Sequence, residues 1–142
     1  MIDNYYESYP TLKEYMSKQI DFARENGYVE TLMGRRRYLT NINSQNGMIR
    51  SADERNAVNA PIQGSAADII KIAMKNIFNI LSEKEFKSKM ILQVHDELVF
   101  DVHLSELDKI KKVVKNSMEN AVTLDIPLKV DIGTGKNWLE AH

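Results

Sequence analysis

The sequence contains no cysteine, which excludes a disulfide framework, a zinc ribbon and a thiol nucleophile. A chain without cysteine suits a reducing compartment, and its polar, acidic start lacks the basic and apolar pattern of a signal peptide. No apolar run approaches the roughly 18 residues that a membrane-spanning helix requires. We therefore expect a cytoplasmic protein that does not enter a membrane.

Compositional bias is also absent, since 43% of the 142 residues are hydrophobic and 27% are charged, which excludes collagen-like and disordered classes. The net charge is only −1, but residues 28–75 carry seven positive and four negative side chains, a net +3. Five of the six arginines lie in this segment: Arg35, Arg36, Arg37, Arg50 and Arg55. Guanidinium groups bind phosphate oxygens bidentately, so the cluster is a candidate phosphate-binding surface; a solvated charged loop is the alternative.

Helix signals dominate the first half of the chain. A capping-box pattern at Thr11 predicts a helix that ends at Asn26, and two short extended segments flank a glycine turn after it. A second capping box at Ser51 predicts a short helix that ends near Asn59, because Pro61 disfavours helical geometry in the residue before it. A new helix is expected to begin at Pro61, with apolar residues every three or four positions.

The second half changes from helical to alternating periodicity. Segments 90–95 and 98–103 alternate and are joined by Asp96 and Glu97, which predicts a β-hairpin. A helix is expected to begin at Ser105, and a last strand at 128–132. The fold class is therefore α+β, an antiparallel sheet packed against helices on one face. Because no linker or repeat interrupts it, we expect residues 1–142 to form one domain.

His95, Asp96 and Glu97 form an unusual polar motif between two strongly apolar strands. Polar turns are common, so a plain turn is one interpretation. An acidic pair at the end of a buried hairpin would instead concentrate negative charge that Mg²⁺ could compensate. One hairpin supplies only half of a two-metal site, and no second acidic motif in the chain clearly completes it.

Arg55, Asn59 and Gln63 recur at intervals of four residues, which places them on one side if the chain stays helical through Pro61. Such a row of donors could reach the minor-groove acceptors of a base pair and check its shape without reading its sequence. A hydrophilic helix face is the alternative. No P-loop, GxGxxG, GxSxG or HExxH pattern occurs, which removes those enzyme classes.

Three stretches in order carry a resemblance to a known family: GYVETLMGRRR at 27–37, ERNAVNAPIQGSAAD at 54–68 and QVHDELVF at 93–100. Together they closely resemble the C-terminal end of family A DNA polymerases of the bacterial DNA polymerase I type. The resemblance implies that Asp96 is a catalytic carboxylate and metal ligand and that Glu97 is its auxiliary acidic neighbour. It also implies that His95 lies near the primer terminus.

The same resemblance implies that Arg55, Asn59 and Gln63 touch the minor groove and template at the primer-terminal pair. Arg35 and Arg36 belong to the basic segment that is expected to face DNA. One departure from the family pattern is Thr40, which stands where the family usually has proline.

The family's upstream aspartate motif and its fingers helix have no counterpart here. We therefore expect a C-terminal palm fragment, beginning with a fingers-to-palm helix, of a DNA-directed DNA polymerase used in replication and repair. Its partners would be primer-template DNA and deoxynucleoside triphosphates, with two Mg²⁺ ions, and the fragment would not polymerise DNA by itself. An exposed hairpin edge predicts self-association. The alternatives are a stand-alone, non-catalytic DNA-binding module and a scaffold with an incidental acidic hairpin.

Overall fold

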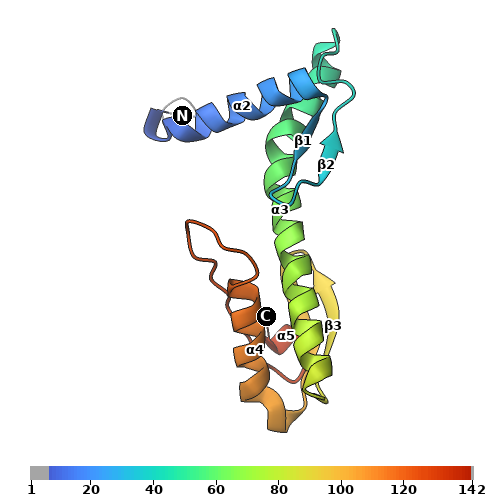
Figure 1. Ribbon diagram of the computed structural model, residues 1–142, viewed down its shortest axis with the longest axis vertical. Coiled ribbons are helices and arrows are strands. Elements are labelled where there is room, and N and C mark those ends of the chain that lie inside the picture. The colour runs from blue at the N-terminus through green and yellow to red at the C-terminus, as the bar shows by residue number, and fades with distance from the viewer. Residues whose placement is uncertain (1–6, 142) are drawn as a thin grey trace. The chain divides into compact units, whose positions relative to one another are not determined.

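The computed structural model describes residues 7–141, which divide into two compact units, one ending at Asp68 and the other beginning at Ile69 (Figure 1). The long helix α3, Gly47–Glu83, contributes to both. Each unit is described by itself, and the expectation of one domain for residues 1–142 stays a prediction. Within the described range, no helix is both long and apolar enough to cross a membrane.

The first unit begins with helix α2, Pro10–Asn26, followed by strands β1, Tyr28–Glu30, and β2, Arg36–Tyr38. Pro10 occupies the first turn of α2, where its missing N–H costs nothing. The capping box expected at Thr11 does not form, since Tyr9 is the N-cap and no side chain caps the helix. The predicted stop is confirmed: Gly27 has φ 78°, and its N–H bonds to the carbonyl of Ala23.

Strands β1 and β2 pair antiparallel around a turn in which Gly34 has φ 74°, a conformation that favours glycine. The predicted extended segments are therefore confirmed, although each strand is only three residues long. Beneath the hairpin lies a small core in which α2 and α3 both take part: Ala23, Val29, Leu39, Ile42 and Ala57.

Helix α3 runs without interruption through Pro61, so the predicted break near Asn59 is wrong. It also begins earlier than Ser51, because the Asn46 side chain accepts a hydrogen bond from the N–H of Met48 at 3.0 Å. An internal proline removes one helical hydrogen bond and costs about 3 kcal/mol. Pro61 is buried and Ala57, one turn earlier, is fully buried, so packing on this side of the helix offsets that cost.

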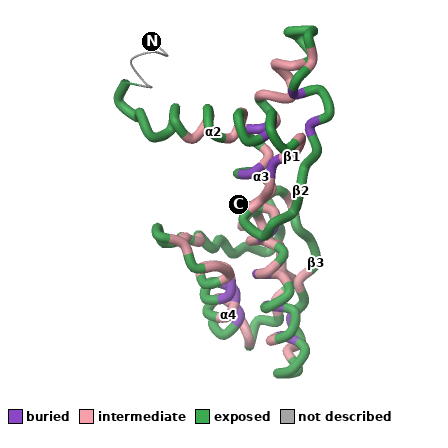
Figure 2. Tube along the Cα trace, turned by 45° about the horizontal axis from the view of Figure 1, so that its top comes forward, coloured by how far each residue is buried: buried purple, intermediate pink, exposed green. Residues whose placement is uncertain are grey.

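The second unit contains strands β3, Lys89–Val94, and β4, Glu97–Asp101, then the 3-10 turn η1, Leu104–Glu106, and helices α4, Leu107–Glu119, and α5, Trp138–Ala141. The helix expected at Ser105 is therefore α4, preceded by η1. The buried core of this unit joins α3 to α4 through Ile77, Leu81, Ile110 and Val114. Leu98 and Phe100 of β4 pack against it, so the predicted packing of the hairpin on helices is confirmed. Figure 2 shows the buried positions of α4 as purple segments of the tube.

The last predicted strand, 128–132, is wrong, because the structure has no strand there. In place of a strand partner, the N–H of Val130 bonds to the Glu119 carboxylate at 3.2 Å, which ties this segment to the end of α4. The described residues thus form two separate two-stranded antiparallel sheets rather than one larger sheet. The α+β class is confirmed.

Candidate functional site

The acidic motif lies at the turn of the β3–β4 hairpin. Val94 pairs with Glu97, so the two-residue turn consists of His95 and Asp96, and Glu97 is the first residue of β4. We expected Asp96 and Glu97 to form the turn; it lies one residue earlier because His95 adopts the positive φ that such turns need at their first position. Asp96 is exposed and Glu97 is half-buried.

His95 holds the backbone of this turn in a costly conformation. Its φ of 52° lies in the left-handed region, which costs a residue with a Cβ roughly 1–2 kcal/mol, although histidine tolerates it better than most. The side-chain amide of Gln93 donates to the carbonyl of His95 and closes the turn from the strand side. Strained residues cluster where a site must hold a fixed geometry, which makes this turn a candidate functional feature.

A β-bulge interrupts the hairpin four residues before the turn. Met90 pairs with Phe100 and Leu92 with Val99, so Ile91 is the extra residue on β3. We expected Met90, Leu92 and Val94 to share one face. The bulge breaks that alternation and leaves Ile91 60% and Leu92 45% exposed.

The acidic turn does not by itself form a closed metal site. Among residues 7–141, no three histidine, aspartate or glutamate side chains lie close enough together to hold a metal ion. Asp96 and Glu97 are two adjacent carboxylates at one turn, and carboxylate oxygens are ligands that Mg²⁺ prefers. The donor set therefore fits part of a Mg²⁺ site, with the remaining ligands to come from elsewhere.

The uninterrupted helix places Arg55, Asn59 and Gln63 on one exposed side of α3. Their spacing corresponds to successive helical turns. The predicted row required the chain to stay helical through Pro61, and it does. The Arg55 guanidinium donates to the Ser51 hydroxyl one turn earlier at 3.0 Å, which orients the side chain along the helix. That these residues touch DNA stays a prediction.

The three consecutive arginines of the β1–β2 hairpin differ in their partners among the described residues. Arg35 bonds to Asp68 through Nε at 3.0 Å, and Arg36 bonds to Glu30 at 2.7 Å. Arg36 also lies 4.3 Å from the centre of the Tyr28 ring. The hydrogen bond to Glu30 and the charge of Tyr28 raise the pKa of Arg36 further above its usual range. Within the described residues Arg37 has no such partner.

The structure brings the helix row and the arginine segment together in the unit that ends at Asp68. His95, Asp96 and Glu97 belong to the unit that begins at Ile69, which is described separately. The predicted site is therefore present as two parts, each with its own local geometry.

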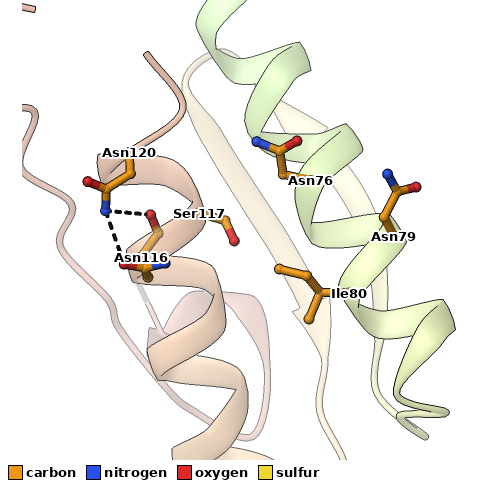
Figure 3. A pocket seen from close by; sticks show the side chains of 6 residues that line it. All are labelled: Asn76, Asn79, Ile80, Asn116, Ser117 and Asn120. Atoms are coloured by element: carbon orange, nitrogen blue, oxygen red, sulfur yellow. Dashed lines mark hydrogen bonds between the residues drawn. The ribbon is translucent and has the colours of Figure 1, made fainter. Parts of the chain in front are cut away.

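A hollow of about 350 Å³ in the second unit lies between α3 and α4 and contains none of the predicted site residues. Figure 3 shows the side chains that line it: Asn76, Asn79, Ile80, Asn116, Ser117 and Asn120. The Asn120 amide donates to the carbonyl and side-chain oxygens of Asn116 at 2.9 and 3.0 Å. None of these groups titrates near neutral pH, so the hollow offers no general acid or base.

The family model for DNA polymerase family A matches residues 1–140. The chain belongs to DNA polymerase family A. It is 54% identical over 140 residues to DNA polymerase I of Lactococcus lactis and 49% identical over 140 residues to DNA polymerase I of Bacillus subtilis. Each alignment covers 99% of this chain and 16% of the relative, so the chain spans about one sixth of the length of these family A proteins.

A solved structure of the family is also similar. The POL domain of Pol1 from M. smegmatis, in complex with DNA primer-template and dNTP, matches with a TM-score of 0.96 and 44% sequence identity. The match covers 99% of this chain and 25% of that chain. The resemblance seen in the three sequence stretches is therefore confirmed at the level of family and fold.

Sequence reasoning missed the carboxylate that holds Arg35. Asp68 is only 8% exposed and lies five residues after Gln63 on α3, yet its place among apolar residues of the helix gave it no predicted role. A lone acidic residue among apolar neighbours, in a segment of net positive charge, was the available signal, because a buried carboxylate needs a partner.

Proposed function

We propose that this chain is the C-terminal palm portion of a DNA-directed DNA polymerase that extends a primer along a template. The observation that carries the proposal is the acidic pair at the hairpin turn, Asp96 in the turn and Glu97 at the start of β4, in a chain that a family A model matches over residues 1–140. The similarity to a POL domain solved with primer-template and dNTP supports these partners for the complete protein. Replication and repair are the processes that this reaction serves.

In this proposal Asp96 supplies a metal ligand and Glu97 a second carboxylate beside it. Two Mg²⁺ ions, when bound, would activate the primer hydroxyl and neutralise the charge of the triphosphate. The exposed turn leaves the Asp96 carboxylate open to solvent, while the strained His95 backbone and the Gln93 amide fix where it points. Positioning and charge supply most of the rate in phosphoryl transfer, so a fixed carboxylate is what this step requires.

The exposed face of α3 supplies the contacts to DNA. Arg55, Asn59 and Gln63 present hydrogen-bond donors at successive helical turns, suited to minor-groove acceptors that hardly differ between base pairs. His95 lies at the metal-binding turn, near the primer terminus. Among the arginines, Arg36 can exchange its exposed partner Glu30 for a phosphate, because exposed ion pairs contribute at most about 1 kcal/mol.

The chain alone is expected to be inactive, because Asp96 and Glu97 provide only part of a two-metal site. The remaining ligands and the nucleotide-binding residues would come from other parts of the complete protein. We also propose a cytoplasmic location, which agrees with the absence of cysteine.

The decisive test is Asp96→Ala in the complete protein, assayed by primer extension with Mg²⁺. We expect the rate of extension to fall by at least about a hundredfold, because a charge-stabilising group of the transition state is lost. Binding of primed duplex, measured separately, should change much less.

Asp101→Ala is the matched control. Asp101 is an exposed carboxylate at the opposite end of the same hairpin, paired with Lys89, so its loss changes the charge of the hairpin but not the turn. Near-normal extension by the Asp96→Ala protein, or an equal loss in both variants, would show that the turn has no specific role.

A further inference from the structure

The turn between β1 and β2 is attached to α3 by four side-chain hydrogen bonds. The Thr31 hydroxyl donates to Oδ2 of Asp68, and Nε of Arg35 donates to Oδ1 of the same carboxylate at 3.0 Å. Nη2 of Arg35 also donates to the carbonyl of Gly64 at 3.1 Å. The Ser65 hydroxyl accepts from the N–H of Leu32 at 2.7 Å. The turn is thus held at both of its ends, by consecutive turns of one helix.

Burial distinguishes this attachment from the other ion pairs of the arginine segment. The two arginine side chains are about equally exposed, 52% for Arg35 and 49% for Arg36, but the carboxylates differ: the Asp68 side chain is 10% exposed and the Glu30 side chain 36%. If Arg35 left, the buried Asp68 carboxylate would lose the charge that compensates it, which costs more than the loss of a pair between two exposed side chains. Arg35 is therefore not free to leave Asp68 for a phosphate, whereas Arg36 can leave Glu30.

The turn also lies in direct contact with the helix backbone. A Cβ added to Gly64 would lie 2.5 Å from Cγ2 of Thr31, so only glycine permits this approach. Gly64 and Ser65 follow Gln63 immediately, and the missing N–H of Pro61 weakens α3 just before it. The attachment therefore stabilises α3 next to Pro61, where the helix lacks one of its backbone hydrogen bonds.

We propose that Arg35 and Asp68 form an internal clamp, and that Arg35 is a positioning residue for Gln63 rather than a phosphate ligand. The inference rests on the proposed function, because Gln63 is assigned there to the primer-terminal base pair. It replaces the expectation that Arg35 contacts DNA and leaves Arg37 as the guanidinium of the turn region that no carboxylate of residues 7–141 binds. The clamp fixes the turn on one side of α3 just after Pro61, and so holds in place the helical turn that carries Gln63.

Asp68→Asn in the complete protein separates the two roles of Arg35, because the substitution keeps the shape of the side chain and removes its charge. If Asp68 merely competed with phosphate for Arg35, the variant would bind primed duplex more tightly. If Asp68 is part of a clamp, both Asp68→Asn and Arg35→Ala slow extension of a paired primer by about tenfold, because the base pair is held less well. The double variant should then lose no more than the worse single variant.

The salt dependence of DNA binding gives a second readout that a loss of stability would not change. Each phosphate contact contributes about 0.9 to the slope of log K against log salt. We expect Arg35→Ala to leave this slope unchanged and Arg37→Ala to reduce it. Lys115→Ala, on α4 of the other unit, is the control because it also removes one positive charge. It should change neither the salt slope of DNA binding nor the rate of primer extension.

Hydrogen–deuterium exchange of segment 28–38 tests the clamp independently of the proposed function, because it does not require primer extension. Both Arg35→Ala and Asp68→Asn should speed exchange at Leu32, whether or not the protein extends primers. Failure of the unaltered protein to extend any primer would overturn the proposed function alone. Tighter DNA binding by Asp68→Asn, a reduced salt slope for Arg35→Ala, or unchanged exchange in both variants would overturn the clamp.

Discussion

At the scale of single residues, the Glu106 carboxylate of the second unit accepts three hydrogen bonds from one connecting segment. Its two oxygens accept hydrogen bonds from the N–H groups of Lys87 and Ser88 at 3.1 and 3.0 Å and from the Ser88 hydroxyl at 2.6 Å. Ser88 in turn accepts from the N–H of His103 at 3.1 Å. One carboxylate thus ties the connection between α3 and β3 to η1.

These hydrogen bonds, the Ser88 hydroxyl above all, hold the pKa of Glu106 below its ordinary value. A carboxylate with a lowered folded-state pKa stabilises the protein above the pKa of the unfolded chain, and the contribution is lost as pH falls through the folded-state pKa. We therefore expect Glu106→Gln to increase hydrogen exchange at Ser88 near neutral pH. The difference from the unaltered protein should disappear in acid, once Glu106 itself is protonated.

Glu83→Gln is the control, since Glu83 is exposed at the end of α3 and makes no hydrogen bond to this connection among the described residues. It should leave exchange at Ser88 unchanged at every pH. An effect of Glu106→Gln that persisted undiminished in acid would contradict the assignment to the ionised carboxylate.

At the scale of elements, the contact between the β1–β2 turn and α3 leads to a prediction about Gly64. Helix propensity alone favours alanine over glycine by about 1 kcal/mol. Because the new Cβ would meet Cγ2 of Thr31 at 2.5 Å, we expect the opposite result, a loss of roughly 1–3 kcal/mol in the free energy of unfolding of this segment. Hydrogen exchange of segment 28–38 measures it.

Thr31→Ser provides the rescue, because serine keeps the hydroxyl that donates to Asp68 and lacks the methyl group that the new Cβ would strike. The combination of Gly64→Ala with Thr31→Ser should recover most of the loss. If Gly64→Ala is as stable as the unaltered protein, the close approach of turn and helix is not a constraint.

Several helices and strands differ from what local sequence patterns predicted. Thr11 and Ser51 match capping boxes, but the helices begin before them, at Pro10 and Gly47. Pro61 predicted a break in the helix, but α3 continues through it because the residues on this side of the helix are buried. Segment 128–132 alternates like a strand, but alternation supplies no hydrogen-bonding partner, and none of the described strands pairs with it. Gly27 was predicted correctly as a helix end because its conformation is a local property.

At the scale of the whole chain, the β3–β4 sheet suggests how the isolated 142 residues would behave. Among the described residues this sheet has two strands, and β3 exposes Ile91 and Leu92 near the bulge. Exposed apolar edge strands pair with other chains, so we expect the isolated chain to self-associate. Leu92→Lys should shift it toward monomer in sedimentation velocity.

Leu104→Lys adds the same charge at another exposed leucine, which lies in η1 rather than on a strand. It should leave association unchanged. A monomeric unaltered chain at high concentration, or equal suppression by both substitutions, would argue against association through β3.

The sequence by itself determined the family, the α+β class and the chemical character of the candidate site, because these depend on which residues are present and in what order. The stretches around Arg35, Gln63 and Asp96 carried the family and the site, and the helical and alternating periodicity along the chain carried the fold class. Only the tertiary structure decided which charges are available. The sequence gives the spacing of the arginines but cannot show that the buried carboxylate of Asp68 binds Arg35 while no carboxylate in the described part of the chain binds Arg37. Ion pairing depends on contacts between residues distant along the chain, and those contacts exist only once the turn is packed on α3.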